Sequence, residues 1–258
     1  RDLVRSRGLG DVYKRQEWGG GGGAYCRATD PEEWGANAIF GIEERAMRFR
    51  SYYKLPAAQP ANEVCVAHNG SLVPIPGRDV MVQAWYSGGI SVFDWTDPEN
   101  PVEIAYHDRG ALSETPRMTG PWSAYWYNGV IVSSEISRGL DIFELVPSPM
   151  LSENEIEAAE SVRVDRFNPQ TQRRFEWPAT FALAGAYVDQ LERSAGLDRP
   201  RIASVRERLA SAERASASER RSSLEALALE LEGEAEASGD SGKVRTLAAT
   251  VRQLASGA

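Results

Sequence analysis

Few side chains in this sequence are of the kinds that perform acid–base or metal chemistry. His68 and His107 are the only histidines among 258 residues, and the acidic residues Asp79 and Asp108 neighbour them. Imidazole and carboxylate groups together can hold a transition metal. The spacing of known ligand pairs is absent, however, and histidines in loops between strands more often bond to backbone groups. The sequence therefore predicts neither a metal site nor a cofactor.

A carboxylate pair for hydrolysis is the second candidate. Asp94, Asp97, Asp108 and Glu135 could supply two carboxyl groups for glycoside cleavage, although Asp97 is better explained as the cap of an Asp-Pro turn. The strongest combination for a hydrolase is His68 with Asp94 and Asp108. It requires the three side chains to converge within about a hydrogen-bond length.

An aromatic cluster is the third candidate, formed by Trp122, Tyr125, Trp126 and Tyr127. Such a cluster could bind a sugar or a peptide, and a carbohydrate site would need Trp122 and Trp126 exposed side by side. Aromatic side chains between packed sheets are more often ordinary core. The triplet Asn69–Ser71 fits the N-glycosylation pattern, but we expect it to form a turn.

These residues lie in or beside a repeat with a period of fifty residues. The segments Val80–Asp94 and Val130–Glu144 align without a gap, and most non-identical positions exchange similar side chains. We expect the two segments to form equivalent hairpins in the same register. Five positions are identical: Val80 and Val130, Val82 and Val132, Ser87 and Ser137, Gly89 and Gly139, Phe93 and Phe143.

Each copy has two short strands around a Ser-x-Gly turn. In the first copy Val80, Val82 and Tyr86 point to one face, while Met81 and Trp85 point to the other, so both faces are apolar and need cover. Ser71–Ile75 before the first hairpin and Val102–Tyr106 after it bring the count to four in that unit, and Ser123–Tyr127 is the counterpart of Ser71–Ile75 before the second hairpin. Four-stranded units at this period are typical of β-propeller blades. The sequence predicts an all-β partial propeller of two to three blades.

The same residues resemble a known family, the LVIVD-repeat β-propellers of bacteria and archaea. Ile90–Asp94 carries the motif, Leu140–Glu144 carries it more loosely, and Thr96–Val102 is similar to the family's turn into its outer strand. The resemblance covers about residues 37–148. It implies a propeller fold and an extracytoplasmic location, and no catalytic residue can be carried over from it. The second copy lacks the Asp-Pro-x-Asn-Pro turn and runs into Val146–Pro149, which indicates the end of the propeller.

The segments before the repeats predict little ordered structure. Residues 1–16 resemble translated sequencing-adapter read-through, a non-native tail that implies a missing native N-terminus, export signal and earlier blades. Residues 17–36 are expected to be a disordered glycine-rich loop, because Gly19–Gly23 lacks the strand and the Lys-Ser/Thr of a phosphate loop. The sequence leaves open whether Cys26 and Cys65 form a disulfide.

The composition becomes alanine-rich and charged after about residue 148. Residues 149–177 are expected to form a capped short helix and a linker, with Ser152 and Glu155 as a capping box. Residues 178–258 are expected to form a small helical bundle, because short apolar stripes at helical spacing pack against one another. The stripes are Phe181, Ala184, Val188 and Leu191; Ile202, Val205, Leu209 and Ala212; Leu224, Leu227 and Leu231; and Val244, Leu247, Val251 and Leu254.

Charge and hydropathy exclude two classes of partner. The formal charge of −8 offers no basic stripe for nucleic acid, and no apolar run is long enough for a membrane span. We therefore expect a protein-interaction or scaffolding module with a protein or glycan partner. A hydrolase or a carbohydrate-binding module on the propeller channel face is the alternative. An unclosed ring would leave one blade face and the outer edge strands exposed, with Met81, Trp85 and Val92 among the residues affected, and would favour oligomerisation or aggregation.

Overall fold

The computed structural model describes residues 12–13, 26–112, 114, 118–171 and 174–257. The chain forms two compact units. The strand unit contains residues 1–74, 78–145 and 163–175, and the helical unit contains residues 75–77, 146–162 and 176–258. In the described residues, no helix is both long and apolar enough to cross a membrane.

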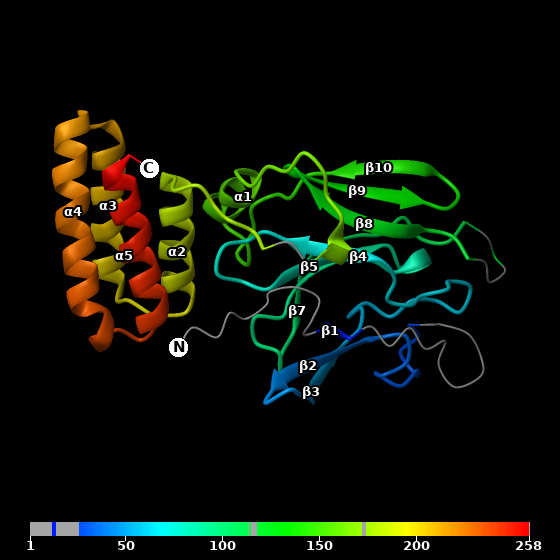
Figure 1. The fold of residues 1–258 in the computed structure, drawn as a ribbon. Helices are drawn as coiled ribbons and strands as arrows, with labels where there is room; N and C mark the ends of the chain where they lie inside the picture. Colours follow the sequence, from blue (N-terminus) through cyan, green and yellow to red (C-terminus); the bar gives the residue numbers. More distant parts are fainter. Residues whose placement is uncertain (1–11, 14–25, 113, 115–117, 172–173, 258) are drawn as a thin grey trace. The chain divides into compact units, whose positions relative to one another are not determined.

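The strand unit contains three antiparallel sheets (Figure 1). The second sheet has the order β4-β5-β6-β7, and the third has the order β10-β9-β8. The first sheet is β1 (Val12–Tyr13), β2 (Asn37–Glu43) and β3 (Ala46–Tyr53). The second is β4 (Gly70–Val73), β5 (Val80–Ala84), β6 (Ile90–Asp94) and β7 (Val102–His107). The third is β8 (Pro121–Tyr127), β9 (Val130–Glu135) and β10 (Gly139–Phe143).

The predicted fold class, an all-β partial propeller of two to three blades followed by a small all-α bundle, is wrong because the strands do not form a propeller. The described strands form three separate small sheets without a closed arrangement, and five α-helices make the chain a mixture of β and α structure. The physical reason lies in what a repeat encodes. Its alternating side chains and turn glycines specify a hairpin locally, whereas the arrangement of one sheet against the next depends on contacts between sheets that the repeat does not specify.

The expected register of the two copies is confirmed. Val82 pairs with Val92 in the first copy, and Val132 pairs with Ile142 fifty residues later. The neighbouring pairs correspond in the same way along both hairpins. Gly89 has φ of 83° and Gly139 has φ of 102°, so the turn of each copy uses a conformation that favours glycine.

The first and second sheets enclose a common core. Tyr53 stacks on Phe93 with ring centroids 3.9 Å apart. Met81 and Trp85 are fully buried in the same cluster, and Val92 is 3% exposed on the opposite face of its sheet. The expectation that Met81, Trp85 and Val92 would be left exposed is therefore wrong, because both faces of the second sheet are covered.

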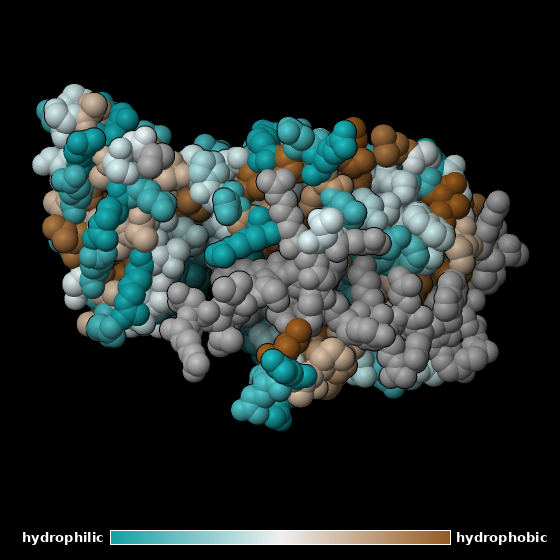
Figure 2. Space-filling view, viewed as in Figure 1, coloured by the Kyte–Doolittle hydropathy of each residue, from teal (hydrophilic) through white to brown (hydrophobic). Residues whose placement is uncertain are grey.

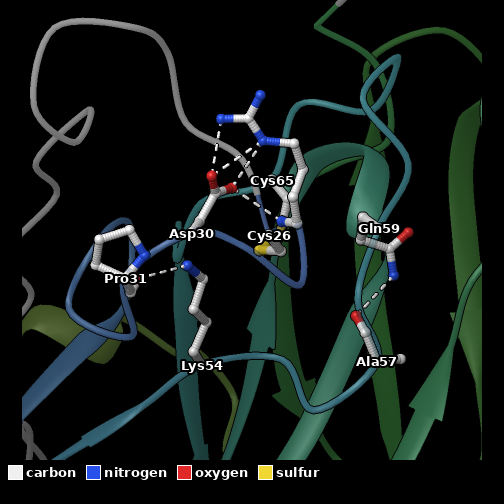
Figure 3. The surroundings of a disulfide bond; sticks show 8 residues. Cys26, Asp30, Pro31, Lys54, Ala57, Gln59 and Cys65 are labelled. Atoms are coloured by element: carbon white, nitrogen blue, oxygen red, sulfur yellow. Dashed lines mark hydrogen bonds and ion pairs between the residues drawn. A yellow bond between two sulfur atoms is a disulfide. The ribbon is translucent and has the colours of Figure 1, made fainter.

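A disulfide joins Cys26 to Cys65 and lies within this core (Figure 3). Its Cα atoms are 5.4 Å apart, and the cysteines are 39 residues apart in sequence. Asp30 anchors the adjoining turn, accepting hydrogen bonds from the Arg27 backbone and guanidinium. The guanidinium holds the pKa of the Asp30 carboxyl below its usual value.

The N-terminal expectations fall mostly outside the described residues. Of residues 1–16, only the backbone of Val12–Tyr13 is described, and it pairs with β2 as a short strand. Residues 17–25 lie outside the description. Residues 26–36, expected as the end of a disordered loop, instead contain the disulfide and a turn, and bury Ala36.

The helices of the second unit surround one apolar core containing the predicted stripes, with Phe181 and Leu254 packed at its margin. Ser152 and Glu155 form the predicted capping box of α1. Buried Glu155 also accepts hydrogen bonds from Gln190 and Arg193. The helices are α1 (Glu153–Glu160), α2 (Phe181–Arg193), α3 (Arg199–Arg214), α4 (Ala217–Glu234) and α5 (Ser241–Ser256).

Part of the expected linker belongs to the strand unit. The Asn128 side chain donates to the carbonyl of Val164 and accepts from the Val164 N–H, and Arg163 donates to the Asn128 carbonyl. These bonds hold residues 163–164 against the β8–β9 turn. A connection that satisfies its backbone in this way is part of the packed structure.

Candidate interaction surface

Both carboxylate oxygens of Asp94, the first acidic residue of the hydrolase hypothesis, already accept hydrogen bonds from within the protein. One carboxylate oxygen accepts from Nε and Nη2 of Arg78, at 2.9 and 2.7 Å. The other accepts from the backbone N–H and hydroxyl of Thr96. This network closes the turn after β6 and leaves the carboxylate little capacity to act on a substrate.

His68 and Asp108 lie toward the opposite end of the second sheet from Asp94. The backbone N–H of His68 donates to Ala84, which pairs with Ile90. Ile90 and Asp94 are the two ends of β6, about 13 Å apart at the usual rise of a strand. Asp108 follows β7 and accepts from the Gly110 N–H. The hydrolase candidates therefore do not converge as a triad.

The other acidic candidates, Asp97 and Glu135, accept hydrogen bonds that stabilise turns. Asp97 accepts from the backbone of Glu99 and the side chain of Asn100, confirming it as a turn cap. Glu135 accepts from the backbone N–H groups of Gly120 and Ser137. Within the described residues, no group of three His, Cys, Asp or Glu side chains could hold a metal ion.

Turns from both copies meet at a small cleft beside His107 in the strand unit. Its volume is about 10 Å³, room for about one water molecule. Arg109 pairs with Asp141 across its rim at 2.5 Å, and the His107 ring lies 4.6 Å from that of Phe143. The cleft is too small to hold an organic substrate.

The two candidate ligand-binding tryptophans have different surroundings. Trp126 is 3% exposed and belongs to the inner side of the third sheet, whereas Trp122 is 46% exposed. The rings of His68 and Tyr86 lie beside Trp122. The two indoles therefore do not form an exposed pair. Ser71 of the possible glycosylation triplet is buried at the start of β4.

A buried polar network joins three strands of the first and second sheets. The hydroxyls of Tyr53 and Ser91 lie 2.5 Å apart, and the Ser91 hydroxyl donates to Glu103 at 2.6 Å. Burial raises the pKa of Glu103 above its ordinary value of 4.5, although the bonds from Ser91 and Tyr53 oppose the shift. The folded strand unit therefore holds this proton more strongly than the unfolded chain does.

The raised pKa predicts a pH dependence of stability. The contribution of Glu103 is fully present below its unfolded pKa and is lost as pH rises through the folded pKa. Glu103→Gln keeps a hydrogen-bond acceptor without the charge, so its stability advantage over the original chain should grow between about pH 4 and about pH 7. Urea unfolding at both pH values measures it, with exposed Glu144→Gln as control. An advantage independent of pH would contradict the prediction.

The helical unit has a larger groove, of about 700 Å³, which Phe181, Leu209 and Leu254 help to line. Its two arginines are held by the protein itself. Arg206 bonds to Asp189 and Glu192, and Arg220 donates to backbone carbonyls at the end of α3. Nothing in the groove indicates what ligand it would bind.

The surface that stands out lies on the third sheet. The backbone N–H of Trp126 donates to the Ser71 hydroxyl at 2.9 Å, and Ser71 pairs with Val82. Directly paired residues share a face, so β8 packs over the Val82 face of the second sheet. Trp126 pairs with Ile131, which is also buried. The third sheet thus covers the second with its Trp126 face, and within the described part of the chain no other sheet covers its opposite face.

We call this opposite side the open face; it consists of Tyr125, Tyr127, Val130, Val132, Leu140 and Ile142. Leu140 is 65% exposed and Ile142 is 63% exposed. Their equivalents in the first copy, Ile90 and Val92, are each only 3% exposed. Figure 2 shows hydrophobic residues on the surface over this sheet. The two copies thus have the same pattern, but only the first has its outer apolar face covered.

The sheet also has an open edge at β10. In Figure 1, β10 is the outermost strand of its sheet, with β9 on its other side. Its equivalent in the first copy, β6, is paired on both sides, by β5 and β7. An exposed sheet face and edge were expected from the sequence, but at Met81, Trp85 and Val92 of the first copy; they lie instead in the second copy, which lacks the turn that leads to a fourth strand.

Comparison with protein-family models, curated proteins and solved structures found no match to this chain.

Proposed function

We propose that this chain is a protein-interaction or scaffolding module whose docking surface is the open face. The observation that supports it most is the difference between the copies. The first copy buries Ile90 and Val92 under another sheet, while the second exposes Leu140 and Ile142 at the same positions. Adjacent exposed aliphatic residues on a flat sheet are typical of a protein interface.

The internal packing also indicates the chemistry of the partner. Within the chain, the outer face of the second sheet is covered by a face that carries Ala124, Trp126 and Ile131, all buried. A partner for the open face should present a similar apolar sheet surface with an aromatic anchor. The placement of His68, Asp94 and Asp108 gives no comparable support to a hydrolase.

The disulfide supports an extracytoplasmic location for the proposed interaction. A buried disulfide persists in oxidising compartments and is rare in reducing ones. The Cys26–Cys65 bond therefore agrees with the extracytoplasmic location implied by the resemblance of Ile90–Asp94 to the LVIVD repeat. That resemblance is to a repeat motif and names no partner.

The test is partner capture with matched variants. Leu140→Asp with Ile142→Asp should weaken binding about 100-fold, because two aliphatic side chains contribute about 3 kcal/mol or more when buried. Leu229→Asp is the control, since Leu229 on α4 is also 65% exposed. Affinity capture from the source organism, followed by mass spectrometry and titration, should recover the same partner with the original chain and the control only. Equal recovery with all three proteins would refute the proposal.

A further inference from the structure

We infer that the free edge of β10 is a binding site for an extended segment of a partner protein, which joins the third sheet as its fourth strand. This inference rests on the proposed function and specifies how the partner engages the same sheet. Strand addition of this kind uses the backbone N–H and C=O groups that an edge strand leaves unpaired.

In the first copy, β7 pairs with β6 in the way that we infer for the partner strand and β10. Its strand β6 pairs with β7 through Ile90 with His107, Ser91 with Tyr106 and Val92 with Ala105. In the second copy Leu140, Asp141 and Ile142 take the places of Ile90, Ser91 and Val92, and they pair with β9 in the equivalent register. The edge of β10 is therefore equivalent to the edge of β6 that pairs with β7, and among the described residues no strand pairs with it.

The sequence explains why the chain does not fill this edge itself. After β6, the turn at Thr96–Pro101 returns the chain as β7. After β10, the chain continues through Val146–Pro149, which contains no such return strand, and enters the helical unit. Among the described residues, no strand pairs with β10 on its outer side.

The side chains at the edge indicate the chemistry of the occupant. In the first copy the Ser91 hydroxyl donates to Glu103 of β7. The corresponding residue in the second copy is Asp141, whose carboxylate accepts from Arg109 and cannot donate to a glutamate as the Ser91 hydroxyl does. A suitable strand therefore resembles β7 in placing a small residue, as at Ala105, opposite Ile142, but carries a neutral or basic residue where β7 has glutamate.

The test uses the chain's own strand as a probe. A labelled peptide with the sequence Pro101–Asp108 and the change Glu103→Lys should give a saturable rise in fluorescence anisotropy with the full chain. The unchanged peptide should bind several-fold more weakly, and the difference should shrink at high salt. A third peptide with the further change Ala105→Pro should not bind, because proline removes a backbone donor and is excluded from paired central strands.

Hydrogen exchange locates the bound peptide. The lysine peptide should slow amide exchange in Gly139–Phe143 and leave β6 unchanged. Absence of saturable binding, equal binding of the proline peptide, or protection elsewhere would overturn the inference. Such results would leave the docking proposal standing if Leu140→Asp with Ile142→Asp still abolishes partner capture. If that double variant captures the partner normally while the peptide protects β10, the proposed use of the open face fails and the edge site stands.

Discussion

Replacement of Phe93 by aspartate should unfold the strand unit. Phe93 is fully buried, stacks on Tyr53 and belongs to the core between the first and second sheets. The substitution removes the ring, which costs about 3–5 kcal/mol in a core of this kind. It also buries a carboxylate without a partner, which adds several kcal/mol. Together these costs are comparable with the whole stability of a domain.

The repeat supplies a matched control for this substitution. Phe143 occupies the same position in the second copy but is only half-buried. Phe143→Asp should therefore destabilise the strand unit much less than Phe93→Asp. Thermal melts followed by tryptophan fluorescence and near-ultraviolet circular dichroism measure both, and the helical signal at 222 nm should persist in each variant. Equal destabilisation by the two substitutions would show that Phe143, which lies beside Ile131 on the covered side of the third sheet, is packed as tightly as Phe93.

The hairpins of the strand unit could be predicted from the sequence because they depend on local rules. Alternation of apolar residues fixes which side chains share a face, and the glycine of each Ser-x-Gly turn supplies the positive φ. For this reason the register of Val80–Asp94 and Val130–Glu144 agrees with the expectation pair by pair. The α1 capping box depends on equally local spacing.

The arrangement of the sheets could not be predicted in the same way. Apolar faces indicate that a strand must be covered, but they do not say by what or in which geometry. Met81 and Trp85 show this, because they are covered by the β2–β3 hairpin, which lies outside the two aligned copies of the repeat. The cysteines belong to the same core, yet two cysteines in a sequence do not reveal whether they meet.

The candidate site was missed for a related reason. Residue types with known chemistry, such as His68 and Asp94, attract attention in a sequence, although the structure uses Asp94 to hold a turn. The open face consists of aliphatic residues and tyrosines, whose alternation along the sequence is that of a buried core. Leu140 and Ile142 differ from Ile90 and Val92 in exposure and hardly at all in type. Among the described residues, the feature that sets the second copy apart is the absence of a strand that follows β10 and pairs with it.

The disulfide should contribute a large share of the stability of the strand unit. Cys26 and Cys65 close a loop with a sequence separation of 39 residues. In the unfolded chain, a cross-link over such a loop removes conformational entropy worth about 4 kcal/mol at 25 °C. The bond also fixes the segment before β2 against the residues before β4, where Cys65 is fully buried. Both effects are lost when the bond is broken.

Replacement of both cysteines by alanine should therefore lower the free energy of unfolding of the strand unit by about 2–4 kcal/mol. Its Tm should fall by roughly 10 °C, given its size. Calorimetry of the full chain can follow the strand and helical units as separate transitions, and the helical one should be unchanged because it contains neither cysteine. The original chain under reducing conditions should match the double variant, whereas reductant should not affect the variant further. An unchanged strand-unit transition in both experiments would mean that Cys26 and Cys65 are held together by the surrounding core, with no contribution from the bond.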